Sequence, residues 1–512
     1  MKIKTVKLKN FRSYKEEVPI DLNDLTVFVG KNDIGKSTVL EALDIFFNEG
    51  KGAIKMDKDD VNKGALSEGD DEIIISVVFE DFPDEILIDA TNPTTLSGEY
   101  LLNADGCLEI SKRYKNGGKE KVFIKANHPT NSDCSDLLLK KQTELRKIIN
   151  DGSIECADKT RNAIMRKAIW ESVDELELSD IEIDASKEDA KNTWIKLKEF
   201  MPLFVLFQSD RKNHDGDSEV QDPLKFAVEQ ILKGDSIKEK LKEVADEVER
   251  KLTEVAKGTL EKLNEMNPDI AESLIPVIPG TETLKWKDVF KSVTISGDEG
   301  IPINKRGSGV KRLILLNFFR AEAERRKDEE GLPAIVYAIE EPETSQHTEH
   351  QKILIRSFID LSELDSTQIL LTSHSPMVVK ELDFSNLRLI SIDDERNKNI
   401  EAIEAGHLPY PSLNEINYSA FGEITEEYHN ELFEHLKTVH AEDVGIKRFD
   451  QNYFQAVKGE PNNCPWMANP NKVSIHTHVR NQIHHRADCG TASFEDLSYS
   501  IGKMREFIIE EV

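Results

Sequence analysis

The first part of the chain alternates strand-like and helix-like patterns of hydrophobic residues. Residues 3–8 alternate apolar and basic side chains, as a half-buried strand does, and Leu25–Val29 is a short apolar run typical of a buried strand. A glycine-containing loop, GKNDIGKST, follows this run. After the loop, apolar residues recur at helical spacing: Val39, Leu40, Leu43, Phe46 and Phe47. A strand, a glycine-rich loop and a helix in this order predict an α/β domain.

The next segment has the alternation and the turns of antiparallel hairpins. Glu72–Glu80 alternates as a strand. Two further pairs of short apolar runs flank an Asn-Ala-Asp-Gly turn at residues 103–106 and an Asn-Gly-Gly turn at residues 116–118. Because asparagine and glycine tolerate the positive φ angles of tight hairpin turns, this segment predicts an antiparallel subsheet.

Two charged blocks with helical spacing, residues 135–198 and 223–267, lie on either side of an apolar strand at residues 203–207. We interpret residues 135–270 as an inserted arm of antiparallel helices, interrupted by a return strand near 203–207. A hairpin, a helix at residues 311–326 and two buried strands follow, and beyond residue 391 the pattern becomes helical and rich in histidine.

These patterns divide the chain into four segments. Residues 1–134 and 271–395 form the two lobes of one α/β domain, residues 135–270 form the helical arm, and residues 396–512 form a C-terminal helical domain. The expected fold is α/β, with a mixed sheet, an antiparallel subdomain and two helical additions.

Composition excludes some classes of protein. The chain of 512 residues carries 67 Lys and Arg against 96 Asp and Glu, a net charge of −29, which argues against a general electrostatic coat on nucleic acid. No apolar run approaches the ~18 residues of a membrane span. The basic N-terminus reads as a strand and not as a signal peptide, so we expect a cytosolic protein. Five cysteines without a C-x-x-C pair fit neither a disulfide framework nor a thiolate zinc site.

The loop after Leu25–Val29 matches the phosphate-binding pattern G-x-x-x-x-G-K-[ST] between a strand and a helix. Its amides can cradle phosphates, Lys36 can reach the outer phosphates, and Ser37 can hold Mg²⁺. The predicted nucleotide-binding residues are Gly30, Lys31, Asn32, Asp33, Ile34, Gly35, Lys36, Ser37 and Thr38. A chance glycine-rich turn is disfavoured because the loop and both flanking elements agree.

Three later features turn the phosphate site into a hydrolase hypothesis. Glu340 and Glu341 end an apolar strand, so one carboxylate can hold magnesium and the other can orient the attacking water. His374 follows another strand and can sense the terminal phosphate, although a structural histidine is the commoner case. Ser308 and Gly309 come at the start of a predicted helix, whose free backbone amides could bind an anion. The alternative is that Ser308 is an ordinary N-cap of this helix.

At this point residues 1–395 resemble the ABC-type ATPases of the SMC, RecF and OLD group. The matching motifs are the opening VKLKNFRSY, the Walker A loop GKNDIGKS, the signature-like RGSGVKR, the Walker B strand IVYAIEEPE and the switch-like TSHSP. In that group two heads dimerise head to tail and enclose two ATP molecules. The resemblance therefore implies ATP and Mg²⁺ as cofactors and at least a homodimer.

Carried onto this sequence, the resemblance implies a role for each motif residue. Lys36 would bind phosphate, Glu341 would be the catalytic base and His374 the switch. Ser37 and Glu340 would hold Mg²⁺ together with Gln208, which is equally compatible with a loop position. Ser308 and Gly309 would act on the ATP bound to the other head. The Glu340–Glu341 pair looks like that of the OLD branch, whereas the sequence TSQH that follows EEPE departs from that branch. OLD proteins carry a C-terminal Toprim nuclease, which requires a D-x-D motif. The sequence has no D-x-D beyond His374, so we do not expect Toprim chemistry.

The C-terminal segment RNQIHH has the R-N-x(3)-H form that resembles the HEPN ribonuclease motif, with Arg480 and His485 as its arginine and histidine. In that family the two residues cooperate on an RNA 2′-hydroxyl and the scissile phosphate, without metal. Polar residues packing on a helix are the alternative. Metal binding is disfavoured because Arg480 lies between His476 and His484 on the predicted helix.

The wider C-terminal pattern is similar to the ends of ATPases from bacterial anti-phage systems, including Septu-type and retron-associated ones. That resemblance implies a separately encoded nuclease or toxin as partner. An ATP-regulated HEPN-like ribonuclease and a RecF-like DNA-repair ATPase are the alternative functions.

Basic residues cluster at the first strand and one hairpin, where DNA or RNA can bind or a solvated strand face can lie. They are Lys2, Lys4, Lys7, Lys9, Arg12, Lys15, Lys112, Arg113, Lys115, Lys119, Lys121 and Lys125.

Overall fold

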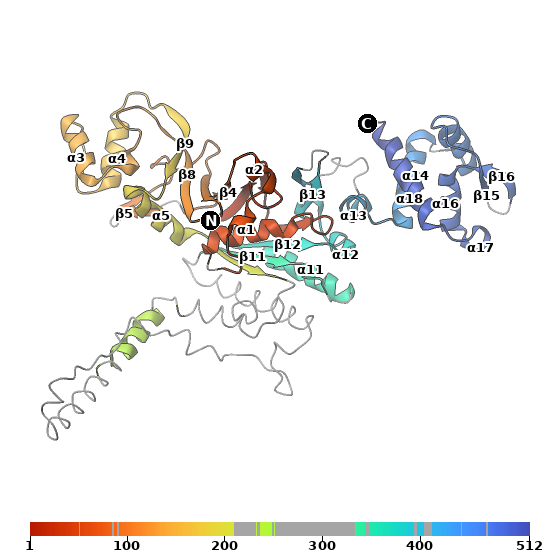
Figure 1. Cartoon of the computed structure of the whole chain (residues 1–512), viewed down its shortest axis with the longest axis horizontal. Coiled ribbons are helices and arrows are strands. Elements are labelled where there is room, and N and C mark those ends of the chain that lie inside the picture. Colours follow the sequence, from red (N-terminus) through yellow and green to blue (C-terminus); the bar gives the residue numbers. More distant parts are fainter. Residues whose placement is uncertain are drawn as a thin grey trace, which may run out of the picture. The chain divides into compact units, whose positions relative to one another are not determined.

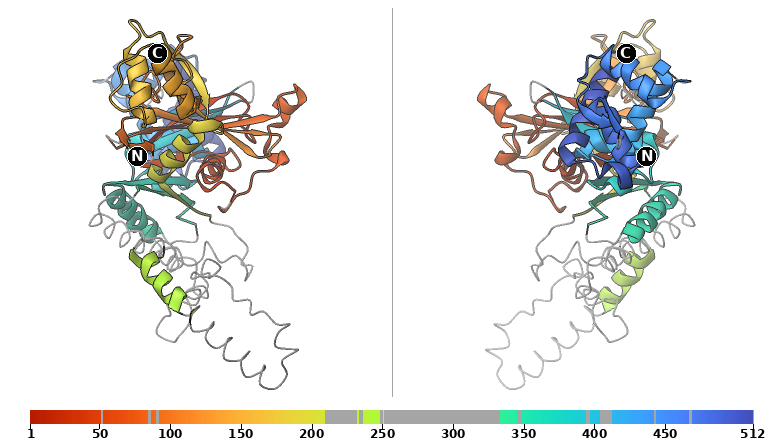
Figure 2. Two further views of the ribbon diagram at one scale, coloured as in Figure 1. Left: turned by 90° about the vertical axis from the view of Figure 1, so that its left-hand side faces the viewer. Right: turned by 90° about the vertical axis from the view of Figure 1, so that its right-hand side faces the viewer.

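The computed structural model describes residues 1–50, 52–83, 86–89, 92–208, 232, 236–247, 250, 333–344, 348–393, 397–403, 412–441, 443–466 and 469–511. The chain divides into two compact units. One comprises Met1–Ser209 and Lys327–Val512, and the other Asp210–Arg326. Figures 1 and 2 show the described elements as coloured ribbons.

A six-stranded antiparallel sheet is built from the first lobe. Its order is β2 (Val18–Asp21), β1 (Lys2–Lys9), β4 (Glu72–Glu80), β7 (Leu108–Lys115), β8 (Glu120–Pro129) and β9 (Leu178–Asp184). Strand β1 buries Ile3, Val6 and Leu8. Ile3 and Val6 are three residues apart instead of two, because the pairing with β4 shifts register between Ile3 and Thr5. The predicted antiparallel subsheet is therefore present, and β9 extends it.

The second sheet is mixed, in the order β10 (Leu203–Phe207), β11 (Ile335–Glu340), β12 (Thr367–Ser373), β3 (Leu25–Val29), β13 (Leu387–Ile392) and β14 (Lys398–Ala402). The first five strands are parallel, and β14 pairs antiparallel with β13. Every residue of β3, β11 and β12 is buried, which is the pattern of strands covered on both faces. The carboxyl ends of these three strands meet at one edge of the sheet.

Helix α1 (Lys36–Asn48) joins the two sheets through one hydrophobic core. Its residues Val39, Leu40, Leu43 and Phe46 are fully buried, and the same core contains Val6 of the antiparallel sheet and residues of β3, β11 and β12. Because α1 begins directly after the phosphate-binding loop, the packing of this one helix determines where the loop lies.

Residues 135–200 differ from the predicted helical arm. They form a 3₁₀ turn, Leu137–Leu139, then α3 (Gln142–Asp151), α4 (Asn162–Glu171), β9 and α5 (Glu188–Phe200). Helices α3 and α4 close a small core around Met165 and Trp170, and β9 pairs with β8. The apolar faces of these short helices are thus buried locally, so the segment belongs to the first unit. Of the second helical block, 223–267, the structure describes residues 236–247, which are helical, with positions 232 and 250.

Shorter elements accompany the two sheets. They are the 3₁₀ turns Lys58–Asp60 and Phe384–Asn386, helices α2 (Lys63–Ser67), α11 (Thr348–Ser362) and α12 (Pro376–Val379), and strands β5 (Ile86–Asp89) and β6 (Asn92–Thr94). None of the helices in the described ranges is long and apolar enough to cross a membrane.

The C-terminal domain is helical, as its sequence pattern predicts. It contains α13 (Leu413–Phe421), α14 (Glu426–Ala441), α15 (Ile446–Phe449), a π-helical turn at Asp450–Gln455, the hairpin strands β15 (Cys464–Trp466) and β16 (Asn469–Val473), α16 (Ile475–His484), α17 (Arg486–Cys489) and α18 (Phe494–Ile509). Aromatic residues including Phe433, Phe449 and Phe454 build its core.

A buried histidine in this core makes the stability of the C-terminal domain depend on pH. His429 is fully buried, and its Nε2 lies 2.8 Å from Ser500 Oγ. Burial, with His476 and other cationic neighbours adding to it, lowers the pKa of His429 from 6.5 to about 3. Below pH 6.5 the unfolded chain therefore binds a proton that the folded chain does not.

The contribution of His429 to stability is present above about pH 6.5 and is lost as the pH falls towards about 3, at roughly 1.4 kcal/mol per pH unit. We expect His429→Gln to flatten the pH dependence of the unfolding free energy over this interval. Urea unfolding followed by circular dichroism measures it. His478→Gln is the matched control, since His478 lies in the same domain without being buried, and an unchanged slope in His429→Gln would contradict the assignment.

Candidate nucleotide site

The phosphate-binding loop leaves β3 at Gly30 and enters α1 at Gly35. Both glycines have positive φ angles, 149° and 105°, and Asp33 between them has a φ of 60°. A Cβ atom at Gly35 would lie 3.0 Å from Ser13 Oγ and 3.3 Å from Tyr14 Oη, so glycine is needed there for both conformation and space. The predicted loop between a buried strand and a helix is therefore present.

Lys36 is held inside the loop that it follows. Its side chain is buried, and Nζ donates hydrogen bonds to the carbonyl oxygens of Gly30, at 2.8 Å, and Lys31, at 2.9 Å. Burial lowers the pKa of the ammonium group, while nearby carboxylates, including Glu341 and Glu343, act in the opposite direction. The ammonium group is thus within electrostatic reach of the acidic residues at the end of β11.

Apart from Lys36, the loop's polar side chains are open or half-open to solvent, whereas the side chain of Ile34 is buried. Lys31, Asn32 and Asp33 are exposed, whereas Ser37 and Thr38 are partly buried at the start of α1. Such a loop presents its backbone and polar side chains outward, at the positive end of the helix dipole, as an anion site requires.

Residues of the opening segment NFRSY contact the phosphate-binding loop and the helix that follows it. Tyr14 is fully buried, and its hydroxyl donates to the carbonyl oxygen of Gly35 at 3.0 Å. Arg12 pairs with Glu41 on α1 and, at 2.8 Å, with Asp60. In the sequence alone, Arg12 counts only among the basic residues of the N-terminal cluster, and Tyr14 has no predicted role. Their signal was their position ahead of the loop, and only the fold shows the contact.

The acidic residues lie at the carboxyl ends of neighbouring strands. Glu340 is the buried last residue of β11 and pairs in register with Thr372 of β12. Glu341 follows with a φ of 41°, a conformation that non-glycine residues rarely adopt, and its N–H donates to the carbonyl oxygen and to Oγ1 of Thr372, both at 3.1 Å. These bonds turn Glu341 away from the strand direction.

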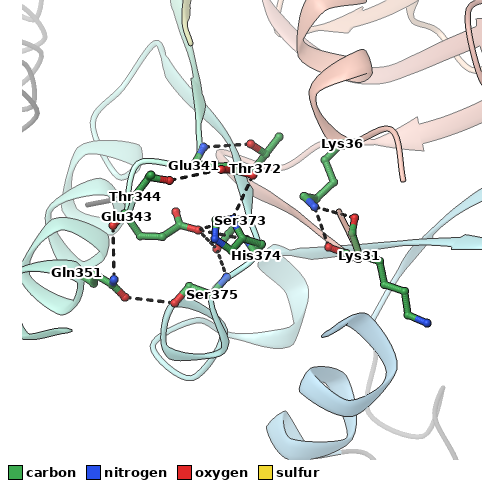
Figure 3. Close-up of polar contacts among 11 residues, drawn as sticks. Lys31, Lys36, Glu341, Glu343, Thr344, Gln351, Thr372, Ser373, His374 and Ser375 are labelled. Atoms are coloured by element: carbon green, nitrogen blue, oxygen red, sulfur yellow. Dashed lines mark hydrogen bonds and ion pairs between the residues drawn. The ribbon is translucent and has the colours of Figure 1, made fainter. Parts of the chain in front are cut away.

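His374 and two glutamates form a cluster at this edge, shown in Figure 3. His374 Nδ1 lies 3.1 Å from Glu341 Oε1 and 3.8 Å from Glu343 Oε1. Glu343, which has only 2% of its surface exposed, accepts hydrogen bonds from Ser373 Oγ at 2.8 Å and His374 N at 3.1 Å. Burial raises the pKa of Glu343. The structure thus brings the predicted Glu341 and His374 together and adds Glu343.

The sequence alone gives Glu343 no predicted role, because a third glutamate two residues after the pair Glu340–Glu341 is an ordinary feature of an acidic turn. Only the hydrogen bonds to Ser373 and to the backbone of His374 show that it connects the ends of β11 and β12.

The other predicted site residues have different outcomes. Gln208 follows β10, and its Nε2 donates to Glu41 Oε1 at 3.3 Å, which places it against α1 one turn beyond Ser37. Ser308 and Gly309 lie outside the described residues.

The donor set at this edge fits magnesium held jointly with a nucleotide. Ser37 offers a hydroxyl and Glu340 a carboxylate, and hard oxygen ligands are those that Mg²⁺ prefers. Among the described residues no group of three or more His, Cys, Asp or Glu is placed to hold a metal ion by itself. Because Mg²⁺ keeps several waters and binds through one or two protein ligands plus phosphates, two oxygen donors suffice.

The two predicted C-terminal residues line one pocket of about 420 Å³. Arg480, on α16, and His485, directly after it, lie there with Trp466, Lys447 and Arg448. Burial lowers the pKa of the Arg480 guanidinium. Arg480 and His485 therefore line the same surface pocket, together with Trp466, Lys447 and Arg448, which the sequence pattern did not indicate.

The predicted basic patch is largely neutralised. Lys7 pairs with Glu109 at 3.1 Å, Arg113 with Glu182 at 2.5 Å, and Lys112, with 1% of its side chain exposed, with Glu120 at 3.0 Å. Lys2, Lys9, Arg12, Lys15 and Lys125 also form ion pairs. The cations of the first strand and hairpin therefore pair with carboxylates of the same fold, because the sheet brings opposite charges on neighbouring and next-but-one strands within reach of each other. This favours the solvated strand face over the nucleic-acid patch.

Solved structures with related arrangements are SMC head domains. An Smc head bound to the C-terminal winged-helix domain of ScpA aligns at 14% identity and a TM-score of 0.38, covering 79% of this chain and 99% of that one. The SMC head domain from Thermotoga maritima aligns at 12% identity and 0.33, covering 79% and 100%. An Smc head with an extended coiled coil, bound to the C-terminal domain of ScpA from Pyrococcus furiosus, aligns at 14% and 0.38, covering 78% and 96%.

Comparison with curated proteins finds no match. Among protein families, the model described as "AAA ATPase domain" matches residues 1–379. This match includes the phosphate-binding loop, the β11 carboxylates and the β12 histidine. The chain therefore belongs to the AAA ATPase domain family.

Proposed function

We propose that this protein binds ATP with Mg²⁺ and hydrolyses it at the edge where β3, β11 and β12 end. The observation that carries the proposal is the meeting of the Lys36 loop with Glu341 and His374 at that edge. Phosphate-binding amides, a cation, and a carboxylate able to orient water are the parts that phosphoryl transfer needs.

Each residue has a distinct task in this proposal. Lys36 exchanges the carbonyl oxygens of Gly30 and Lys31 for the outer phosphates of ATP. Ser37 and Glu340 hold Mg²⁺, which neutralises charge on the phosphates when bound, and Gln208 is a further metal-side candidate. Glu341 accepts the proton of the attacking water, and His374, 3.1 Å from it, senses the terminal phosphate and orients the base.

Head-to-tail dimerisation completes the proposed site. Ser308 and Gly309 would contact the ATP held by the partner head, so ATP binding would drive association. Sedimentation with and without ATP tests this, and Ser308→Arg should abolish ATP-dependent association while leaving ATP binding to the monomer intact. Association that is indifferent to both ATP and Ser308→Arg would exclude it.

For the biological role we propose a defence ATPase that holds or releases a separately encoded nuclease or toxin. The support is the similarity of the C-terminal sequence pattern to anti-phage ATPases. Co-purification with the products of neighbouring genes, followed by phage challenge of cells carrying Lys36→Ala, tests it. DNA-stimulated hydrolysis without any such partner would instead favour the RecF-like repair ATPase.

A second candidate function is favoured by one observation, the shared pocket of Arg480 and His485. In a HEPN-like cleavage, a 2′-oxygen attacks the adjacent phosphorus as the bond to the 5′-oxygen breaks. His485 would take the 2′-hydroxyl proton and supply one to the leaving 5′-oxygen, while Arg480 would stabilise charge on the phosphorane. ATP binding at the distant loop would then regulate this chemistry.

We expect Arg480→Ala and His485→Ala each to lower RNA cleavage by about 10²-fold or more, since each removes one transition-state contribution. ATP hydrolysis should stay at the wild-type rate in both variants. Cleavage of a labelled RNA and phosphate release, measured on the same preparations, test both statements. His484→Ala is the neighbouring control, and wild-type cleavage in Arg480→Ala or His485→Ala would reject the ribonuclease.

A further inference from the structure

The pocket beside Arg480 is assembled from three separate parts of the C-terminal domain. One part is Gly445 with Lys447 and Arg448 of α15. The second is Trp466, at the end of β15, and the third is Arg480 of α16 with His485 directly after that helix. The pocket is a hollow of about 420 Å³ that is largely open to solvent.

The cations of this pocket differ from those of the antiparallel sheet. Lys447 and Arg448 form no ion pair with any residue that the structure describes, whereas the strand lysines of the antiparallel sheet face carboxylates. The acidic neighbour of Arg480 is Glu434, 3.9 Å away. The whole chain has a net charge of −29. The surface of this pocket therefore has the opposite sign to the chain as a whole, because Lys447 and Arg448 have no carboxylate partner among the described residues.

Arg480 also carries an unused donor. Only 14% of its side chain is exposed, and its buried Nε has no hydrogen-bond partner. A buried donor without a partner is unfavourable, so this nitrogen gains from any side-chain movement that brings an acceptor within hydrogen-bond distance. Arginine and lysine clustered in this way suit a phosphate, because its several oxygens can accept hydrogen bonds from more than one cation.

Trp466 supplies the second half of a recognition site. It lies at the edge of the pocket, partly exposed, at the end of β15. Aromatic rings beside cations are the arrangement that binds unpaired nucleotides, because a base stacks on the ring while the phosphate meets the charge.

We propose that this pocket binds an unpaired nucleotide, with its phosphate on Lys447, Arg448 and Arg480 and its base on Trp466. The nucleotide is either free or part of a single strand, and both sources share this chemistry. The proposal deepens the ribonuclease candidate, which needs such a substrate site, but binding requires neither cleavage at His485 nor ATP at Lys36.

Fluorescence anisotropy of a labelled single-stranded RNA of about ten nucleotides, on the full chain, tests the pocket. Trp466→Ala should weaken binding about tenfold, and Trp466→Phe should restore most of it. Lys447→Ala and Arg448→Ala should each weaken binding and lower the slope of log affinity against log salt by about 1. Lys121→Ala is the matched control, since Lys121 is an exposed lysine of β8.

Each comparison decides one point. Competition by uridine monophosphate assigns the pocket to free nucleotides, and competition only by unlabelled strand assigns it to single strands. Equal affinity for duplex RNA, equal losses in Lys121→Ala, or no loss in Trp466→Ala would overturn the proposal. Binding of RNA without cleavage by the wild-type protein separates the pocket from the ribonuclease, and binding in the absence of ATP separates it from the ATPase.

Discussion

Replacing Lys36 with alanine is expected to abolish ATP binding and to reduce ATP hydrolysis by at least about 10³-fold. Lys36 is the one buried cation of the phosphate loop, and in a water-excluded site such a charge stabilises developing phosphate charge far more strongly than it would in water. Its hydrogen bonds to the loop carbonyls already place the ammonium group where phosphate oxygens would replace those carbonyls. Equilibrium binding of a fluorescent ATP analogue and phosphate release measure the two effects.

Lys31→Ala is the matched control for this experiment. Lys31 lies in the same loop with an exposed side chain, and its contribution to the contact with Lys36 is its backbone carbonyl, which alanine keeps. It should bind ATP nearly as the wild type does. Thermal unfolding of Lys36→Ala shows whether loss of two buried hydrogen bonds has disturbed the fold. A folded Lys36→Ala protein that still bound ATP normally would refute the proposed site.

Glu341→Gln is expected to lower the rate of hydrolysis by about 10²–10⁴-fold while leaving ATP affinity close to wild type. Glutamine retains the size of the side chain and its contact with His374 but cannot accept the proton of the attacking water. Because hydrolysis would no longer reset the protein, ATP-bound dimers should accumulate. Single-turnover hydrolysis, ATP titration and sedimentation with ATP measure the three consequences.

Glu340→Gln separates the two neighbouring carboxylates. If Glu340 holds Mg²⁺, its variant should need a higher Mg²⁺ concentration for ATP binding, whereas Glu341→Gln should not. Wild-type turnover in Glu341→Gln would remove the catalytic assignment from that residue, and the buried Glu343 would then be the next carboxylate to test.

The local geometry of the candidate ATP site could be predicted from the sequence. The loop GKNDIGKST needs only its own glycines and the following helix to form, and an apolar run that ends in two glutamates places carboxylates at the end of a buried strand. These are short-range consequences of residue type and spacing, so Lys36, Glu341 and His374 could be named in advance. Their proximity also followed, since parallel strands end at one edge of a sheet.

The supporting contacts depended on residues far apart in the chain. Tyr14 bonds Gly35, Arg12 pairs with Glu41, and Glu343 joins two strand ends, and no local pattern distinguishes these side chains from others of their type. The segment 135–200 is a similar case. Its helical spacing was real, but whether short amphipathic helices extend as an arm or close on a local core depends on which apolar surface they meet.

The charged residues show the same difference between what the sequence predicts and what only the fold shows. The sequence by itself determined the α/β order of elements, the phosphate loop, the strand-end carboxylates and the total charge of −29, because these follow from spacing and composition. Only the tertiary structure decided which charges meet. It pairs the cations of the first strand and hairpin with carboxylates on other strands of the same sheet, and it leaves Lys447 and Arg448 beside Arg480 without acidic partners among the described residues. The physical reason is that a charge's surroundings are set by the neighbours that folding brings within a few ångströms, which sequence separation does not reveal.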